Sequence, residues 1–123
     1  MLPQSLLNSR LLRIERPVRG GLGGGIQGYT TVLSIVDGTS FNAIHEATQD
    51  LVRSENGAEI QLEGRLYVDD EALAAVRNGD LVTFRDRLGR TRTRAEIATL
   101  ELAGGPNHLL SHWELGLRAG VLT

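Results

Sequence analysis

EIQLEGRLYV, residues 59–68, shows the clearest strand pattern in the chain. Apolar and polar side chains alternate along it, which gives an apolar set of Ile60, Leu62, Leu66 and Val68 and a polar set of Gln61, Glu63 and Arg65. Alternation with a period of two is typical of a half-buried strand, because successive side chains point to opposite faces of a sheet. Gly64 interrupts the apolar side and predicts a bend or bulge.

The residues that follow extend the β pattern. LVTFRDR (residues 81–87) and TRTRAEIATLEL (residues 91–102) are strand-like and flank Leu88-Gly89-Arg90, so they predict a β-hairpin. HLLSHWELGL (residues 108–117) alternates again, and its candidates for burial are Leu109, Trp113, Leu115 and Leu117. Between these strands, DDEALAAVRNG (residues 69–79) predicts one short helix that ends at Asn78-Gly79.

The residues before position 59 are more varied. YTTVLSIV (residues 29–36) is rich in β-branched residues and ends at Asp37-Gly38, which predicts a strand. The segment from 39 to 57 is ambiguous: its apolar residues recur at roughly helical spacing, and Thr39 or Ser40 fits as a cap, so it accounts for a second short helix. In the first eighteen residues, Pro17 prevents a helix, and a short strand or extended arm is expected.

RGGLGGGIQG, residues 19–28, contains six glycines and predicts an exposed, mobile loop. The loop residues are Arg19, Gly20, Gly21, Gly23, Gly24, Gly25 and Gly28. Three of them spell GxGxxG, but a dinucleotide-binding fingerprint opens into a helix and this one opens into a strand. Nucleotide binding is therefore not expected.

These segments predict one mainly β domain of 123 residues, a small β-barrel or sandwich of about six short strands with one or two short helices. Its parts are an N-terminal arm or strand (1–18), the Gly-rich loop (19–28), a β-barrel body (29–118) and a C-terminal tail (119–123). A hydrophobic fraction of 41% is that of a folded protein. The N-terminal leucines are broken by polar residues, so neither a signal peptide nor a membrane anchor is expected.

Several kinds of chemistry are excluded by residue type. All thirteen basic residues are arginine, which excludes catalytic mechanisms that need a lysine. The absence of cysteine excludes disulfides and Cys-bearing zinc sites. His45-Glu46 begins an HExxH motif, but Gln49 stands where the second histidine is needed. In an extended segment His108 and His112 lie about 13 Å apart, too far to share a metal ion. We expect no catalytic residue, no cofactor, no metal and no enzymatic activity.

Charge is unevenly distributed along the chain. Residues 1–28 and 85–94 together hold nine arginines against two acids, whereas residues 37–80 hold ten acids against three arginines. Oppositely charged faces favour pairing with further copies of the same chain. The densest arginine series is Arg85, Arg87, Arg90, Arg92 and Arg94.

The last three members of this series occupy alternate positions, so in a strand they project from one face. Such a stripe is either a solvated face or a contact with an acidic neighbouring subunit or with phosphates. The chain carries its own acidic segment, and an aromatic content of 4% is poor for stacking bases, so the subunit is the preferred partner.

The order of these features resembles the head closure, or stopper, proteins of tailed bacteriophages over about residues 10 to 118. The matching motifs are G-x-L-Y-V (Gly64, Leu66, Tyr67, Val68), G-D-x-V (Gly79, Asp80, Val82) and H-x-E-x-x-L (His112, Glu114, Leu117). The more helical pattern after residue 39 and the longer C-terminal tail depart from that family. Adaptor and tail-terminator proteins of the same neck therefore remain alternatives, as does a small nucleic-acid-binding β-barrel.

The resemblance implies a structural virion protein of the phage neck, made in the host cytoplasm. Its subunits would form a homo-oligomeric ring that joins the filled head to the tail and helps to retain the DNA. Portal and adaptor proteins would be its partners on the head side, and tail-tube or terminator proteins on the tail side. The packaged DNA would be touched only without sequence specificity, and no membrane is involved.

Overall fold

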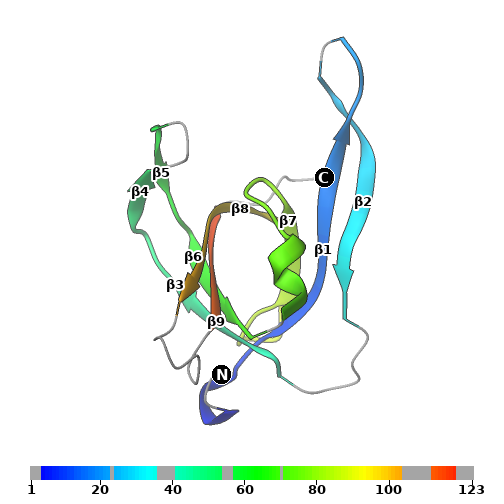
Figure 1. Cartoon of the computed structure of the whole chain (residues 1–123). Coiled ribbons are helices and arrows are strands. Elements are labelled where there is room, and N and C mark those ends of the chain that lie inside the picture. Colours follow the sequence, from blue (N-terminus) through cyan, green and yellow to red (C-terminus); the bar gives the residue numbers. More distant parts are fainter. Residues whose placement is uncertain are drawn as a thin grey trace.

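A computed structural model describes residues 4–22, 24–35, 41–53, 57–69, 71–103 and 112–118, and confirms the mainly β fold. The described residues form nine strands and two short 3-10 helices, with no α-helix among them (Figure 1). The strands are β1 (Arg10–Arg19), β2 (Ile26–Ser34), β3 (Ala43–Ala47), β4 (Leu51–Arg53), β5 (Glu59–Gln61), β6 (Gly64–Val68), β7 (Leu81–Arg85), β8 (Thr91–Ala103) and β9 (His112–Arg118). The 3-10 helices are η1 (Gln4–Leu6) and η2 (Glu71–Ala75).

Seven strands form one antiparallel sheet in the order β2-β1-β7-β8-β9-β6-β3. The sheet curls so that its two halves face each other as in a sandwich, and it does not close into a barrel (Figure 1). β8 joins the halves, because its residues 91–96 pair with β7 and its residues 96–103 pair with β9. Register shifts in both ladders of β8 supply the irregularity that such a bend requires.

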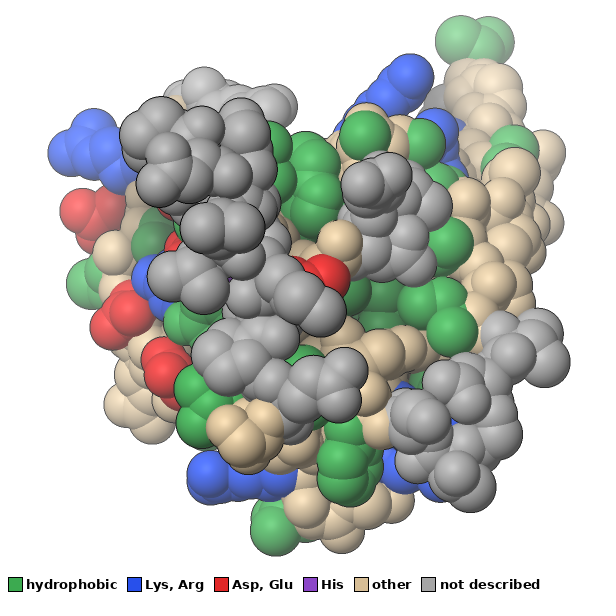
Figure 2. Space-filling model, turned by 60° about the horizontal axis from the view of Figure 1, so that its bottom comes forward, with side chains coloured by type: hydrophobic (Ala, Val, Ile, Leu, Met, Phe, Trp, Pro, Cys, Tyr) green, Lys and Arg blue, Asp and Glu red, His purple; other side chains and the backbone are tan. Residues whose placement is uncertain are grey.

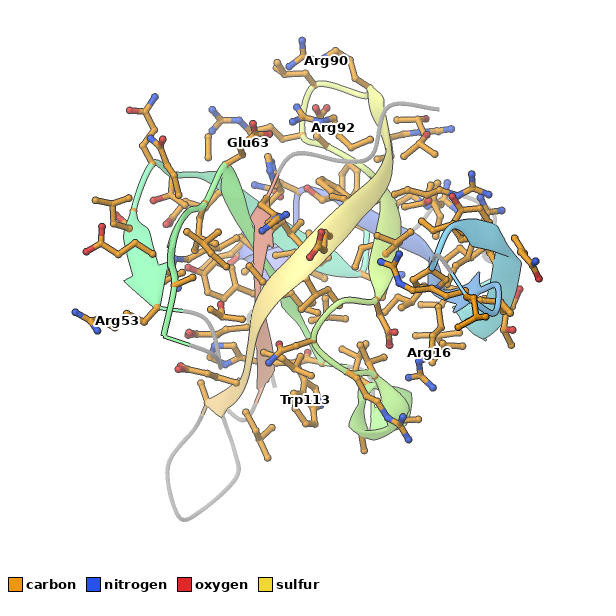
Figure 3. All side chains as sticks on the ribbon, turned by 90° about the horizontal axis from the view of Figure 1, so that it is seen from above. Arg16, Arg53, Glu63, Arg90, Arg92 and Trp113 are labelled. Carbon is orange, nitrogen blue, oxygen red and sulfur yellow. The ribbon has the colours of Figure 1, made fainter. Side chains whose placement is uncertain are left out.

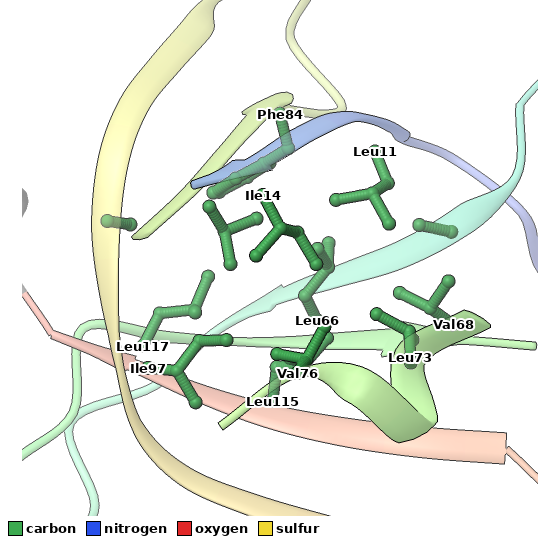
Figure 4. Packing of buried hydrophobic residues seen from close by; sticks show 13 residues of the cluster. Leu11, Ile14, Leu66, Val68, Leu73, Val76, Phe84, Ile97, Leu115 and Leu117 are labelled. Atoms are coloured by element: carbon green, nitrogen blue, oxygen red, sulfur yellow. The ribbon is translucent and has the colours of Figure 1, made fainter. Parts of the chain in front are cut away.

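The core lies between the two halves of the sheet (Figure 4). Each strand of the large sheet except the edge strand β2 sends fully buried side chains into it. Leu73 of η2 and Val76, which follows η2, cover one end. The predicted apolar set is confirmed in part: Leu62, Leu66 and Val68 are buried, and Ile60 is half-buried. Leu115 and Leu117 are buried as predicted, and Trp113 packs against the cluster from its margin.

Two hairpins project from this body on opposite sides (Figure 1). Beyond Glu15 β1 pairs only with β2, so these residues form a two-stranded arm. Pro17 lies in this arm, where the side of β1 that faced β7 has no partner strand among the described residues, so its missing N–H costs no ladder bond there. β4 and β5 form a separate two-stranded sheet on the other side.

The helix expected between residues 39 and 57 is wrong. β3 pairs with β6 along its whole length, and β4 pairs with β5. The helical spacing did not mark a buried face, because Phe41 and Leu51, two of the apolar residues that recur at this spacing, are exposed in the structure. Long-range pairing thus overrides the local pattern here.

Three further boundaries are corrected. The predicted helix of residues 69–79 is only the 3-10 helix η2, followed by a turn in which Gly79 has a φ of 92°. The strand of residues 59–68 is split at residues 62 and 63, not at Gly64, and β5 and β6 belong to different sheets. The Gly-rich loop is shorter than predicted, since Arg19 ends β1 and Gly28 lies in β2.

Several predicted features lie outside the described residues. They are the loop residue Gly23, the turn and caps at 36–40, residues 54–56, Asp70, His108, Leu109 and the tail at 119–123.

Candidate functional site

The arginine series lies on the β7–β8 hairpin, whose tip is organised by the buried side chain of Asp86. Its Oδ1 accepts hydrogen bonds from the backbone N–H groups of Leu88 and Arg90, each at 3.0 Å. The backbone of Asp86 also donates to the carbonyl of Arg90 at 2.8 Å, and Gly89 supports the turn with a φ of 81°. The hairpin predicted around Leu88-Gly89-Arg90 is thus confirmed, and a single carboxylate holds its tip.

The pKa of Asp86 is lowered. Burial raises it, but the backbone N–H groups of Arg90 and Leu88 and the charges of Arg90 and Arg92 outweigh that effect. A carboxyl group whose pKa is lower in the folded than in the unfolded protein contributes stability above its unfolded pKa, and that stability is lost as the pH falls through the folded pKa.

Replacing Asp86 with asparagine should therefore flatten the acid dependence of stability. Asparagine keeps an oxygen for the turn but carries no charge. At pH 7 the wild type should exceed Asp86→Asn in free energy of unfolding by the largest amount. This difference should shrink below about pH 4, where the carboxylate of Asp86 takes up a proton. Urea unfolding at pH 7 and pH 3 measures it, and equal differences at both pH values would contradict a charged Asp86.

Arg90 and Arg92 flank Asp86 inside the same chain. Arg90 Nε lies 3.5 Å and Arg92 Nη1 3.9 Å from Asp86 Oδ2. Arg92 Nη2 also lies 4.0 Å from Glu63 Oε2, and Figure 3 shows these two side chains facing each other while Arg90 lies farther out at the tip. Both arginines thus have acidic neighbours of their own, which reduces the repulsion expected within the series.

Arg94 does not share a face with Arg92, contrary to the prediction. Val82 pairs with Ala95 and Phe84 with Arg92, so a bulge falls between them. Arg94 sits in this bulge with a φ of 54°, which is unusual for a residue other than glycine. Its backbone N–H donates to Thr83 Oγ1 at 3.3 Å. The bulge turns its side chain toward β1 and β2.

There the guanidinium of Arg94 binds two groups. Its Nε lies 3.3 Å from Glu15 Oε1, and its Cζ lies 3.7 Å from the centre of the Tyr29 ring, a cation–π contact. Arg13 Nε approaches the same carboxylate oxygen at 3.1 Å. Burial raises the pKa of Glu15, but the hydrogen bond from Arg94 and the charges of both arginines lower it overall. Arg94 therefore connects β8 to the base of the arm through contacts within the chain.

Arg85 and Arg87 differ from the other three arginines. Both are exposed, and within the described part of the chain neither takes part in an ion pair. Arg85 stands directly opposite Arg10 in the β1–β7 ladder. Of the five arginines in the series, Arg85 and Arg87 are thus the two that face outward without an acidic partner among the described residues.

The shortest ion pair among the described residues was not found by sequence reasoning. Arg16 Nε and Nη2 each lie 2.9 Å from an oxygen of the buried Asp80, and Nη2 also donates to the carbonyl of Ala75. Asp80 Oδ2 accepts from the backbone N–H of Arg77 as well. The hydrogen bonds and charge of Asp80 raise the pKa of Arg16. The G-D-x-V motif marked Asp80, but nothing in the sequence linked it to a residue 64 positions away.

His45 lines a small cavity of about 50 Å³ with Phe84, Arg92 and Leu117. Its ring lies 5.1 Å from that of Phe84, and its Nδ1 is buried without a hydrogen-bond partner among the described residues. Burial and the charges of Arg92 and Arg87 lower the pKa of His45, against the opposing charge of Asp86. The ring is therefore neutral at pH 7, and the cavity has room for little more than water.

Motif residues of the resemblance occupy packing positions. A Cβ on Gly64 would lie 2.9 Å from His45 Nε2, so glycine lets β3 and β6 approach. His112 pairs with Glu114 at 3.3 Å and packs against the Tyr67 ring at 5.8 Å. No cluster of potential metal ligands occurs within the described residues. No helix in that same part of the chain has the length and hydrophobicity needed to span a membrane.

The site as a whole is suited to ionic contact. Its functional groups are the guanidinium groups of arginines and the carboxylates of acids. The carboxylates of Asp86, Glu15 and Asp80 bind groups within the chain, whereas the side chains of Arg85 and Arg87 are exposed. Comparison of the chain with protein-family models, with curated proteins and with solved structures found no match.

Proposed function

We propose that this chain is a non-enzymatic structural subunit of the tailed-phage neck, of the head closure or stopper kind. It would assemble into a homo-oligomeric ring, between portal or adaptor proteins and tail proteins, and help to retain DNA in the head. The proposal is supported by the order of strands and motifs and by the β-rich fold in which those motifs pack together.

The observation that carries the proposal is the pair Arg85 and Arg87. They are exposed on either side of the buried Asp86, which holds the hairpin tip, and neither takes part in an ion pair within the described part of the chain. An acidic neighbouring subunit would compensate these charges. The chain offers such a surface on β3 to β5, whose exposed acids include Glu46, Asp50 and Glu59.

The first test is the content of virions. Purified particles or isolated necks should contain the chain in several equivalent copies, measured by mass. Absence of the chain from assembled particles would end the proposal.

Two charge-reversal variants, one on the β7–β8 hairpin and one outside it, test whether the hairpin contacts another copy. Arg87→Glu should weaken self-association about tenfold or more, because it puts an acid where an acidic neighbour is expected. Arg77→Glu is the matched control, since Arg77 is also an exposed arginine without an ion pair among the described residues, but lies outside the hairpin. Light scattering over a concentration series measures both, and unchanged urea unfolding verifies the fold. Equal effects of the two variants would show that the hairpin is merely solvated.

The same arginines support the alternative of nucleic-acid binding. It predicts affinity for duplex DNA that falls steeply with salt, with a slope that decreases by about 2 when Arg85 and Arg87 are both neutralised. DNA affinity that is lost in this variant while self-association is retained would favour the alternative over the ring.

A further inference from the structure

The β1–β2 arm exposes apolar side chains at its end. Val18 is 44% and Ile26 39% exposed, and Leu22 is fully exposed, although leucine and isoleucine normally lie inside a domain of this size. Arg19, which donates to the carbonyl of Gly24, is the only charged residue among described positions 17–35. The arm thus presents an apolar tip with one positive charge.

The outer edge of the arm also has no partner strand in the part of the chain that the structure describes. β2 is a terminal strand of the large sheet, and its residues 26–34 include no charged residue and no proline. Natural edge strands usually carry such residues, which prevent pairing with another chain. The opposite edge is covered: Asn8 Oδ1 accepts from the His45 N–H at 2.8 Å, and Ser9 forms a bridge with Ala43. Among the described residues, one edge of the sheet is covered and no strand pairs with the other.

The β4–β5 hairpin has complementary properties. It is a sheet of two three-residue strands, a size that is marginally stable in water without further packing. Leu51 is exposed on it, and beside it lies an open groove of about 620 Å³ lined by residues 47–49 and 61–63. The hairpin and the groove are surrounded by the acids Glu46, Asp50, Glu59 and Glu63.

The two surfaces lie on opposite sides of the molecule (Figure 1). In Figure 2, acidic side chains gather at the left, the side of β4 and β5, and none is visible on the arm at the right. Arg53 extends outward on the β4 side in Figure 3, and Arg65 is paired with Asp50 at 3.1 Å, so the acids remain in excess there. Two complementary surfaces on different sides of one molecule allow head-to-tail contact between copies. Such contacts close into a ring when the rotation from one copy to the next divides a full turn evenly.

We infer that the β1–β2 arm of one copy lies against the β4–β5 hairpin and groove of the next copy. Val18, Leu22 and Ile26 meet Leu51 and the apolar part of the groove, and Arg19 meets the acids around it. The inference rests on the proposed ring and names the surfaces that build it. Two-fold pairing of one arm with another would oppose two Arg19 charges and leave the β4–β5 hairpin uncovered.

Paired cysteines test this contact, and the chain has no native cysteine to interfere. The variant Leu22→Cys/Leu51→Cys, treated with a short thiol cross-linker, should give a ladder of covalent multimers. The two positions lie on opposite sides of one molecule, so the link must join different copies (Figure 1). Each single variant should give no ladder, and a mixture of the two single variants should give dimers.

The control variant is Leu6→Cys/Leu51→Cys. Leu6 is exposed like Leu51 but lies on η1, outside the arm and outside the β7–β8 hairpin whose arginines are proposed to contact β3 to β5, so this pair should give no ladder. Dominant dimers from Leu22→Cys alone would overturn the inference in favour of a two-fold contact. Failure of the main pair to cross-link would also overturn it. If light scattering then still shows multimers of the wild type, the ring proposal survives; if it shows a monomer, self-assembly fails with it.

Discussion

Replacing Asp80 with alanine is expected to lower the free energy of unfolding by about 3 kcal/mol. The carboxylate is buried and binds Arg16 through both oxygens and the Arg77 N–H through one of them. Its loss leaves these donors without their acceptor and detaches β1 from the turn that precedes β7. Urea unfolding at pH 7 measures the loss.

The exposed pair of Asp50 and Arg65 is the control for this experiment. Asp50→Ala removes a carboxylate with a similar 3.1 Å contact, but its side chain is 60% exposed, and the cost should stay below about 1 kcal/mol. The double variant Asp80→Ala/Arg16→Ala should lose less than the sum of the two single losses, because each breaks the same pair. Similar costs for Asp80→Ala and Asp50→Ala would refute the role given to burial.

Gly116→Ala is expected to destabilise the chain by about 2 kcal/mol through overpacking. A Cβ at this position would overlap the Thr99 hydroxyl and lie 3.0 Å from a methyl carbon of Leu62. Gly116 pairs with Thr99 next to the register shift in β8, so the backbone there has little freedom to withdraw. The midpoint of urea unfolding should fall accordingly.

Gly28→Ala is the matched control, since Gly28 also lies in a strand but a Cβ there meets nothing within 4 Å. Its stability should equal or slightly exceed that of wild type. Adding Thr99→Ala to Gly116→Ala should recover part of the lost free energy of unfolding, because it removes the hydroxyl that the new Cβ would overlap. If Gly116→Ala and Gly28→Ala behave alike, the close approach is not restrictive.

The parts of the fold that sequence reasoning predicted are those with local causes. The β7–β8 hairpin follows from a glycine turn between two β-rich segments, and burial of Leu66 and Val68 follows from alternation. Residues 43–53 were misassigned because their pattern is ambiguous and their structure depends on pairing with β6 and β5. Nothing within those residues encodes such partners.

The candidate site shows the same division. The arginine series is visible in the sequence, and so is its place on a hairpin. The bulge that turns Arg94 away from Arg92 is not visible in the sequence, because no local pattern predicts a φ of 54° at an arginine. The acid that binds Arg94 lies 79 positions away, so only the fold reveals which arginines are engaged and which remain free.

Because β8 belongs to both halves of the sheet, it sets how the molecule responds to mechanical load. A pull on the tip at residues 86–90 acts on β7, which is bonded to β1, and on β8, which is bonded to β9. The tip therefore cannot be displaced far without shearing two ladders at once. Load applied at the tip would therefore spread through the large sheet instead of opening one hairpin.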